Sequence, residues 1–124
     1  MPAAAQRRSG PVLADLSRAE PFASVEEAWF WTMAALAARN AGARIVAGQG
    51  LKVRPCEPDD VIRCLDRLYR QRRIEIAHVR VMRRFGDMQR APDPTHPGDR
   101  TALVLWREAM SRLEWPLKMK GIVA

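Results

Sequence analysis

Residues 24–40, SVEEAWFWTMAALAARN, carry the clearest structural signal in this 124-residue sequence. Ser24 followed three residues later by Glu27 is the pattern of a capping box, in which each side chain accepts a hydrogen bond from a backbone N–H group at a helix start. Apolar residues then recur at the spacing of one helical face, namely Val25, Ala28, Trp29, Met33, Leu36 and Ala37. We therefore expect a helix that ends near Asn40, with Gly42 available for a left-handed cap.

A second helix is expected after a loop at residues 41–57. The loop contains three glycines and a proline, with room for a short extended piece at residues 43–47. The run Glu57-Pro58-Asp59-Asp60 then places a proline in the first helical turn and carboxylates at the positive end of the helix dipole. The apolar face of this helix consists of Val61, Ile62, Leu65, Leu68 and Tyr69, and it leads into basic residues at 70–73.

Residues 74–85 fit two kinds of secondary structure. Ile74, Ala77, Val81 and Phe85 have helical spacing, whereas the apolar pairs 74/76 and 79/81 alternate as in a strand. Those two pairs are out of phase, so a strand would turn its apolar face over midway. We therefore favour a helix here, with Gly86 as its cap.

The last helix is expected to follow a loop at residues 91–99, which contains too many prolines for a regular element. This helix starts near Asp99, and its core-facing residues are Ala102, Leu103, Trp106, Ala109, Met110 and Leu113. The pair Trp115-Pro116 should end it, because the residue before a proline is pushed out of the helical region.

These elements predict an all-α or mainly α fold, a small bundle of about four helices. A chain of 124 residues suggests one domain, and 48% hydrophobic residues argue against wholesale disorder. Residues 1–20 mix alanine, proline, glycine and charge without a sustained period, so we expect a mobile N-terminal tail with one turn of helix near residues 12–18. The single helical domain would then cover residues 21–124.

A cytoplasmic location without membrane contact is expected. Asp15, Arg18 and Glu20 interrupt the apolar core that a signal peptide would need. The longest apolar run, residues 28–38, is shorter than the roughly 20 residues that span a bilayer. The sequence has only two cysteines, Cys56 and Cys64, which suits a reducing compartment.

The positive charge of the chain is concentrated in its second half. Residues 1–60 are neutral overall, so residues 61–124 hold the whole net charge of +7. Within that half, residues 61–90 carry nine arginines against three acidic residues. The sequence has eighteen arginines and three lysines. A GC-rich coding bias would explain this ratio, but it would not explain why the arginines are clustered in one half. A field this concentrated suggests an acidic partner, most commonly nucleic acid.

Two groups of arginines are the candidate phosphate contacts. Arg63, Arg67 and Arg70 fall at i, i+4 and i+7, which places them on one helical face. A second group, Arg80, Arg83 and Arg84, lies on the polar face of the next segment. The alternative is an ordinary solvated face, in which Asp59 pairs with Arg63 and Asp66 with Arg70.

The second half of the chain resembles a helix-turn-helix module of small bacterial or phage-type DNA-binding proteins. The run 81–86, Val-Met-Arg-Arg-Phe-Gly, is similar to the end of the first helix of such a motif, with Gly86 in the turn. The resemblance implies that residues 100–114 form the recognition helix, with Arg100 and Arg107 as readers of a major groove in double-stranded DNA. The connection after Gly86 exceeds ten residues, so the motif would carry an inserted loop.

The tryptophans divide into core and surface candidates. Trp29 and Trp106 lie on predicted apolar faces and should be core residues. Phe30 and Trp31 point away from the face of Trp29, so they could cover a second packing surface, form a dimer contact or stack on bases. A helix that is apolar on more than one side suggests a homodimer, as in a two-fold DNA binder.

Other chemistries have weaker support. Seven residues separate the two cysteines, which is not the spacing of a zinc site, and His78 and His96 add no ligand pattern. Helix capping explains the acidic pairs at residues 26–27 and 59–60, and the segment 48–52 forms no complete phosphate-binding loop. We therefore expect no catalytic residue, metal or cofactor. The leading interpretation is a small DNA-binding transcriptional regulator, and the alternative is a non-enzymatic module that docks an acidic protein.

Overall fold

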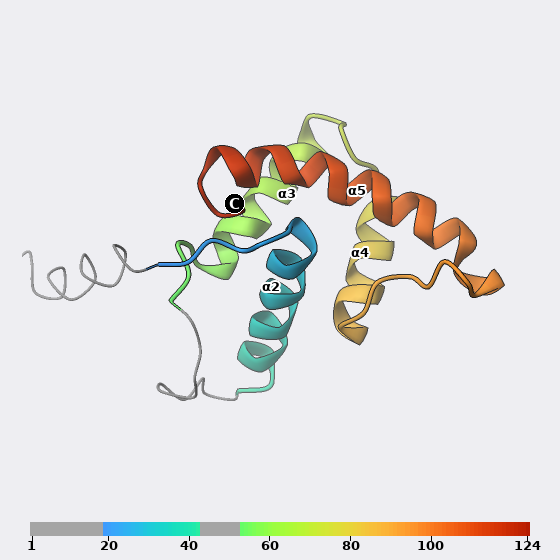
Figure 1. Ribbon diagram of the computed structural model, residues 1–124, viewed down its shortest axis with the longest axis horizontal. Coiled ribbons are helices and arrows are strands. Elements are labelled where there is room, and N and C mark those ends of the chain that lie inside the picture. The colour runs from blue at the N-terminus through green and yellow to red at the C-terminus, as the bar shows by residue number, and fades with distance from the viewer. Residues whose placement is uncertain (1–18, 43–52) are drawn as a thin grey trace, which may run out of the picture.

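The computed structural model describes residues 19–42 and 53–124, and this part of the chain is all-helical (Figure 1). Its four α-helices are α2 (Val25–Asn40), α3 (Pro58–Arg70), α4 (Ile76–Met88) and α5 (Arg100–Met119). A short 3-10 helix, η2 (Pro97–Asp99), precedes α5. The predicted small all-α bundle is therefore confirmed. The expected tail, apart from its last two residues, and the extended piece at residues 43–47 lie outside the described ranges.

Helix α5 organises the bundle, since it lies across α2, α3 and α4 and contacts all three (Figure 1). The core is built where these helices meet, and both predicted core tryptophans, Trp29 and Trp106, are buried in it. Phe85, Met82 and Leu113 are fully buried beside them. None of the helices in the described ranges is long and apolar enough to span a membrane.

The two ends of the described chain are tied together below α5. Phe22 donates a backbone hydrogen bond to the carbonyl oxygen of Ile122 (2.8 Å), and its own carbonyl accepts one from Ala124 (2.9 Å). Phe22, Ile122 and Val123 are all buried. This pairing closes the bundle on the side where α5 ends and α3 begins.

The start and end of α2 follow the sequence prediction. The hydroxyl oxygen of Ser24 accepts a hydrogen bond from the backbone N–H of Glu27 (3.1 Å). The Glu27 carboxylate in turn accepts one from Ala23 (2.7 Å). At the other end, Gly42 has a positive φ of 73°, the left-handed conformation that a glycine adopts without strain. Helix α2 is therefore fixed at both ends by local chemistry.

Helix α4 confirms the helical interpretation of residues 74–85, but Gly86 does not cap it. Gly86 is buried inside the helix, and a Cβ atom there would lie 2.6 Å from Cγ of Met33 and 2.9 Å from Nε1 of Trp29. The helix ends instead at Met88 and is capped by Gln89, whose φ of 57° is left-handed. The glycine is needed for the close approach of α2 and α4. The prediction of a cap was wrong because this contact is made by residues far away in the sequence, which the local pattern does not contain.

Helix α5 also differs from the prediction at its end, because it continues through Pro116 to Met119. Proline inside a helix removes one backbone hydrogen bond, here the one that the Arg112 carbonyl would accept. The continuation places Leu117 on the same face as Leu113, and both side chains are fully buried. Burial of the last turn offsets the cost of the proline.

The loop at residues 91–99 is confirmed, apart from the single turn η2 at its end. The buried Asp99 carboxylate holds it by accepting hydrogen bonds from the backbone N–H of Asp93 (2.9 Å) and from Arg90 (3.3 Å). The backbone N–H of Asp93 is the main reason why the pKa of Asp99 is lowered. A single carboxylate thus orders the approach to α5.

Candidate nucleic-acid interface

The predicted arginines of α3 are exposed, but two of the three have carboxylate partners. Arg63 pairs with Asp60 at 2.8 Å, and Arg70 pairs with Asp66 at 3.0 Å. The second pair is the one expected from the sequence. The expected partner of Arg63, Asp59, pairs with Arg39 at 3.2 Å instead. Arg67 is the α3 arginine without an ion pair to any described residue.

The predicted arginines of α4 and α5 are also exposed, and none has an ion pair within residues 19–42 and 53–124. They are Arg80, Arg83 and Arg84 on α4 and Arg100 and Arg107 on α5. The Arg84 guanidinium lies 5.1 Å from the centre of the Phe85 ring. These side chains are free to meet an external anion.

A mostly apolar groove lies between α3 and α4. Its lining residues are Ile62, Leu65, Asp66, Tyr69, Ile76 and Val79. Tyr69 and Ile76 are about half exposed. With roughly 100° per residue, Arg70 lies about 100° around α3 from Tyr69, and Arg67 lies farther around. Arg70 pairs with the groove residue Asp66, and it lines a neighbouring depression together with Ile76 of α4.

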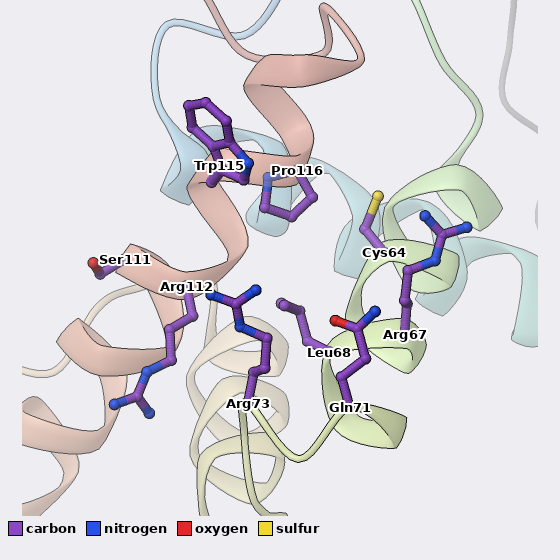
Figure 2. A pocket seen from close by; sticks show the side chains of 9 residues that line it. All are labelled: Cys64, Arg67, Leu68, Gln71, Arg73, Ser111, Arg112, Trp115 and Pro116. Atoms are coloured by element: carbon purple, nitrogen blue, oxygen red, sulfur yellow. The ribbon is translucent and has the colours of Figure 1, made fainter.

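A different group of cations comes together in a cleft of about 370 Å³ between α3 and α5 (Figure 2). The cleft is lined by Cys64, Arg67 and Leu68 of α3, by Gln71 and Arg73 of the following turn, and by Ser111, Arg112, Trp115 and Pro116 of α5. Three of its lining residues are arginines and none is acidic. This α3/α5 cleft is the strongest candidate site for an anion in the described ranges.

Local geometry explains how the cleft residues are presented. Cys64, Leu68 and Gln71 have the spacing of one helical ridge along α3, and Arg67 lies beside them. The chain then turns at Arg72, which has a left-handed φ of 59°, and the backbone N–H of Arg73 bonds to the Leu68 carbonyl oxygen (2.9 Å). Figure 2 shows the Arg73 side chain extending from this turn into the cleft. The guanidinium groups of Arg67 and Arg112 lie at opposite edges, and that of Arg112 points away from Arg73.

Arg112 is placed beside a buried histidine of α4. The ring atom Nδ1 of His78 accepts a hydrogen bond from the backbone N–H of Glu75 (3.0 Å). We therefore assign the ring proton to Nε2, which lies 2.8 Å from a carboxylate oxygen of Glu108. Nη1 of Arg112 is 3.4 Å from the same Nε2. Glu108 is thus engaged by His78, and Arg112 has no ion pair with a described carboxylate.

The two thiols are held in their protonated form. Burial, with smaller contributions from Asp60 and Glu57, raises the pKa of Cys56 to about 11. Burial likewise raises the pKa of Cys64, which lines the cleft. A protonated thiol is a poor nucleophile and a poor metal ligand. Within residues 19–42 and 53–124, moreover, no three His, Cys, Asp or Glu side chains are grouped where they could hold a metal ion.

The aromatic residues proposed for an interface pack partly within their own chain. Phe30 stacks on Trp106 with ring centres 5.6 Å apart, and Trp31 packs against Phe22 at 5.1 Å. Both side chains are half-buried. Their role in a homodimer stays a prediction. By contrast, Trp115 is 66% exposed and makes no ring contact within the described ranges.

Sequence reasoning identified Arg67 but missed Arg73, Arg112 and Trp115. Trp115 and Pro116 line the cleft because α5 continues past them, whereas the sequence predicted that the helix would end there. Arg73 could not be placed from periodicity, because it lies in a turn.

The helix-turn-helix resemblance stays a prediction. Gly86 is not in a turn, and residues 89–99 connect α4 to α5. The shortest connection between α-helices in the described ranges joins α3 to α4 through residues 71–75. This sequence matches no protein-family model, and no curated protein or solved structure is significantly similar to it.

Proposed function

We propose that this protein binds nucleic acid, with the unpaired arginines of the α3/α5 cleft as its main phosphate contacts. The observation that carries the proposal is the composition of that cleft: Arg67, Arg73 and Arg112 line it without a carboxylate. Guanidinium groups offer paired N–H donors that match the oxygens of a phosphate. A cleft with three such groups and no internal counter-charge favours an anionic ligand.

The wider charge distribution supports a polymeric anion. The described ranges contain fourteen arginines, and five of them form ion pairs, which leaves nine exposed arginines without one. These nine extend over α3, the following turn, α4 and α5. A small anion would use only a few of them, whereas a chain of phosphates could contact several groups at once.

The more specific form of the proposal is a cytoplasmic DNA-binding regulator. The exposure of Arg100 and Arg107 on α5 is compatible with base contacts in a major groove. In that case Arg107→Ala should change the order of preference among duplex sequences. A phosphate contact would instead weaken binding to all sequences similarly.

The proposal is tested by fluorescence anisotropy with labelled duplex and single strands of mixed sequence at several salt concentrations. Binding should be detectable at low salt and should weaken steeply as salt rises, because phosphate contacts release condensed counterions. No binding to either form at low salt would reject the proposal.

The alternative is a module that docks an acidic protein through the same arginines. Polyglutamate of comparable charge is the matched competitor. Under the nucleic-acid proposal it should displace bound strands only weakly, because carboxylates are spaced along a flexible chain and offer no base. Tight binding of polyglutamate without binding of nucleic acid would favour the alternative.

A further inference from the structure

Trp115 differs from the other three tryptophans in its surroundings. Trp29 and Trp106 are buried, and Trp31 packs on Phe22. Trp115 is 66% exposed at the edge of the α3/α5 cleft. One exposed apolar side chain is ordinary on a protein surface. The distinguishing feature of Trp115 is that it shares a cleft with three unpaired arginines.

The cleft therefore combines two chemistries that a nucleotide also combines. An indole ring offers a flat face on which a base can stack, and guanidinium groups bind phosphate. In Figure 2 Arg73 extends into the space below Trp115 and Pro116, and Leu68 adds an apolar wall. A volume of about 370 Å³ is within the range of clefts that hold small ligands.

Polar groups near the indole could recognise the edge of a base. The side-chain amide of Gln71 lines the cleft and can both donate and accept hydrogen bonds. Because Pro116 has no N–H group, the carbonyl oxygen of Arg112 lacks its usual helical donor. Such groups favour a ligand that carries hydrogen-bonding atoms beside its aromatic ring, which a base does.

We infer that the α3/α5 cleft binds one nucleotide unit with an unpaired base, which stacks on Trp115 while Arg73 and its neighbouring arginines hold the phosphate. This inference rests on the proposed function and specifies its ligand. A base inside a duplex is stacked between its neighbours and cannot reach the indole. The preferred ligand is therefore a single strand, or a strand with an unpaired position.

The experiment compares three ligands with equal numbers of phosphates: a short oligothymidylate, an abasic strand of the same length and a fully paired hairpin. Affinity is measured by anisotropy, and stacking is followed by quenching of tryptophan emission. Oligothymidylate should bind about five-fold to 150-fold more tightly than the abasic strand, the range expected for stacking of one base. Thymidine monophosphate, added as a competitor, shows whether a free nucleotide also occupies the cleft.

The key variants are Trp115→Ala and Trp115→Phe. Trp115→Ala should abolish the preference for oligothymidylate, whereas Trp115→Phe should keep most of it because a ring remains. The matched control is Val104→Ala, a change at another exposed apolar residue of α5 that does not line the cleft, and it should leave the preference unchanged. Thermal unfolding should be nearly the same for all three variants, because both positions are exposed.

The outcomes separate this inference from the proposed function. Equal binding of the abasic strand and oligothymidylate, or a preference that survives Trp115→Ala, would overturn the inference and leave phosphate binding intact. Absence of binding to every strand would overturn both. If thymidine monophosphate competes for the cleft, a free nucleotide is also a ligand. If it does not compete although oligothymidylate binds more tightly than the abasic strand, the ligand is a nucleic-acid strand.

Discussion

The indole N–H of Trp29 donates a hydrogen bond to the backbone carbonyl oxygen of Met82 at 2.9 Å, which joins α2 to α4 through buried atoms. The contact is close because Gly86 lies one turn further along α4 and presents no side chain to the indole. This pair of helices forms one wall of the bundle on which α5 lies (Figure 1). Its packing is therefore the first place to test the fold.

Gly86→Ala should destabilise the protein, although alanine is ordinarily favoured over glycine in a helix by about 0.5–1 kcal/mol. The added Cβ would lie 2.6 Å from Cγ of Met33 and 2.9 Å from Nε1 of Trp29, so one of the two side chains must move. We expect a loss of about 1–3 kcal/mol in the free energy of unfolding, measured by urea denaturation. In a Met33→Ala background the loss should be smaller. Stabilisation by Gly86→Ala would show that the helices are not this close.

Glu26→Ala should destabilise the protein by leaving a buried donor without an acceptor. Nε1 of Trp106 lies 2.6 Å from a carboxylate oxygen of Glu26, and Trp106 is almost fully buried. We expect a cost of about 1–3 kcal/mol in urea denaturation. Glu26→Gln is the control, since it keeps an oxygen acceptor but loses the charge. Equal losses in the two variants would mean that the charge at the helix start, and not the hydrogen bond, is what matters.

The loop held by Asp99 should weaken in acid. Hydrogen bonds from Asp93 and Arg90 favour the ionised carboxylate and lower its pKa below the ordinary value of 3.8. The carboxylate therefore contributes its stability above that value, and the contribution is lost as pH falls through the lower, folded-state pKa. Between pH 6 and strong acid, thermal melting temperature should fall less in Asp99→Asn than in the wild type. Asp87→Asn, a change at an exposed carboxylate without an ion pair in the described ranges, should leave the acid-induced fall as large as in the wild type.

Cys56 should react slowly with alkylating reagents at neutral pH. With a pKa of about 11, roughly one part in a thousand of the thiol is ionised at pH 8, and the thiolate is the reactive form. Modification by iodoacetamide, followed by mass spectrometry in a Cys64→Ser background, should accelerate as pH approaches 11. Rapid modification at pH 7 would contradict the assigned environment and would reopen a reactive role for this thiol.

The four helices could be predicted because their signals are local. The cap at Ser24, the proline and carboxylates at residues 58–60, and the apolar spacing in α4 each act within a few residues. Gly86 and Pro116 could not be interpreted in this way. Gly86 serves a contact with Trp29 far away in the sequence, and Pro116 is tolerated because the turn beyond it is buried against other helices.

The candidate site was less predictable than the fold. The charge density of residues 61–90 predicted a basic region that contains two of the three cleft arginines, Arg67 and Arg73. Helical spacing then grouped Arg67 with Arg63 and Arg70, although those two residues have carboxylate partners. The grouping of Arg67 with Arg112 depends on the crossing of α3 and α5, which no local pattern encodes.

Two triple variants, each lacking three positive charges, test whether the cleft arginines are the main phosphate contacts. One combines Arg67→Ala, Arg73→Ala and Arg112→Ala, and the other combines Arg80→Ala, Arg83→Ala and Arg84→Ala. The measurement is the slope of log affinity against log salt concentration, by anisotropy with a single strand and a duplex. If the cleft arginines are the main phosphate contacts, the first variant should flatten the slope by about 2.1 on single strands and about 2.7 on duplex DNA. The second variant should flatten it less. An unchanged slope in the cleft variant would show that Arg67, Arg73 and Arg112 are not the phosphate contacts.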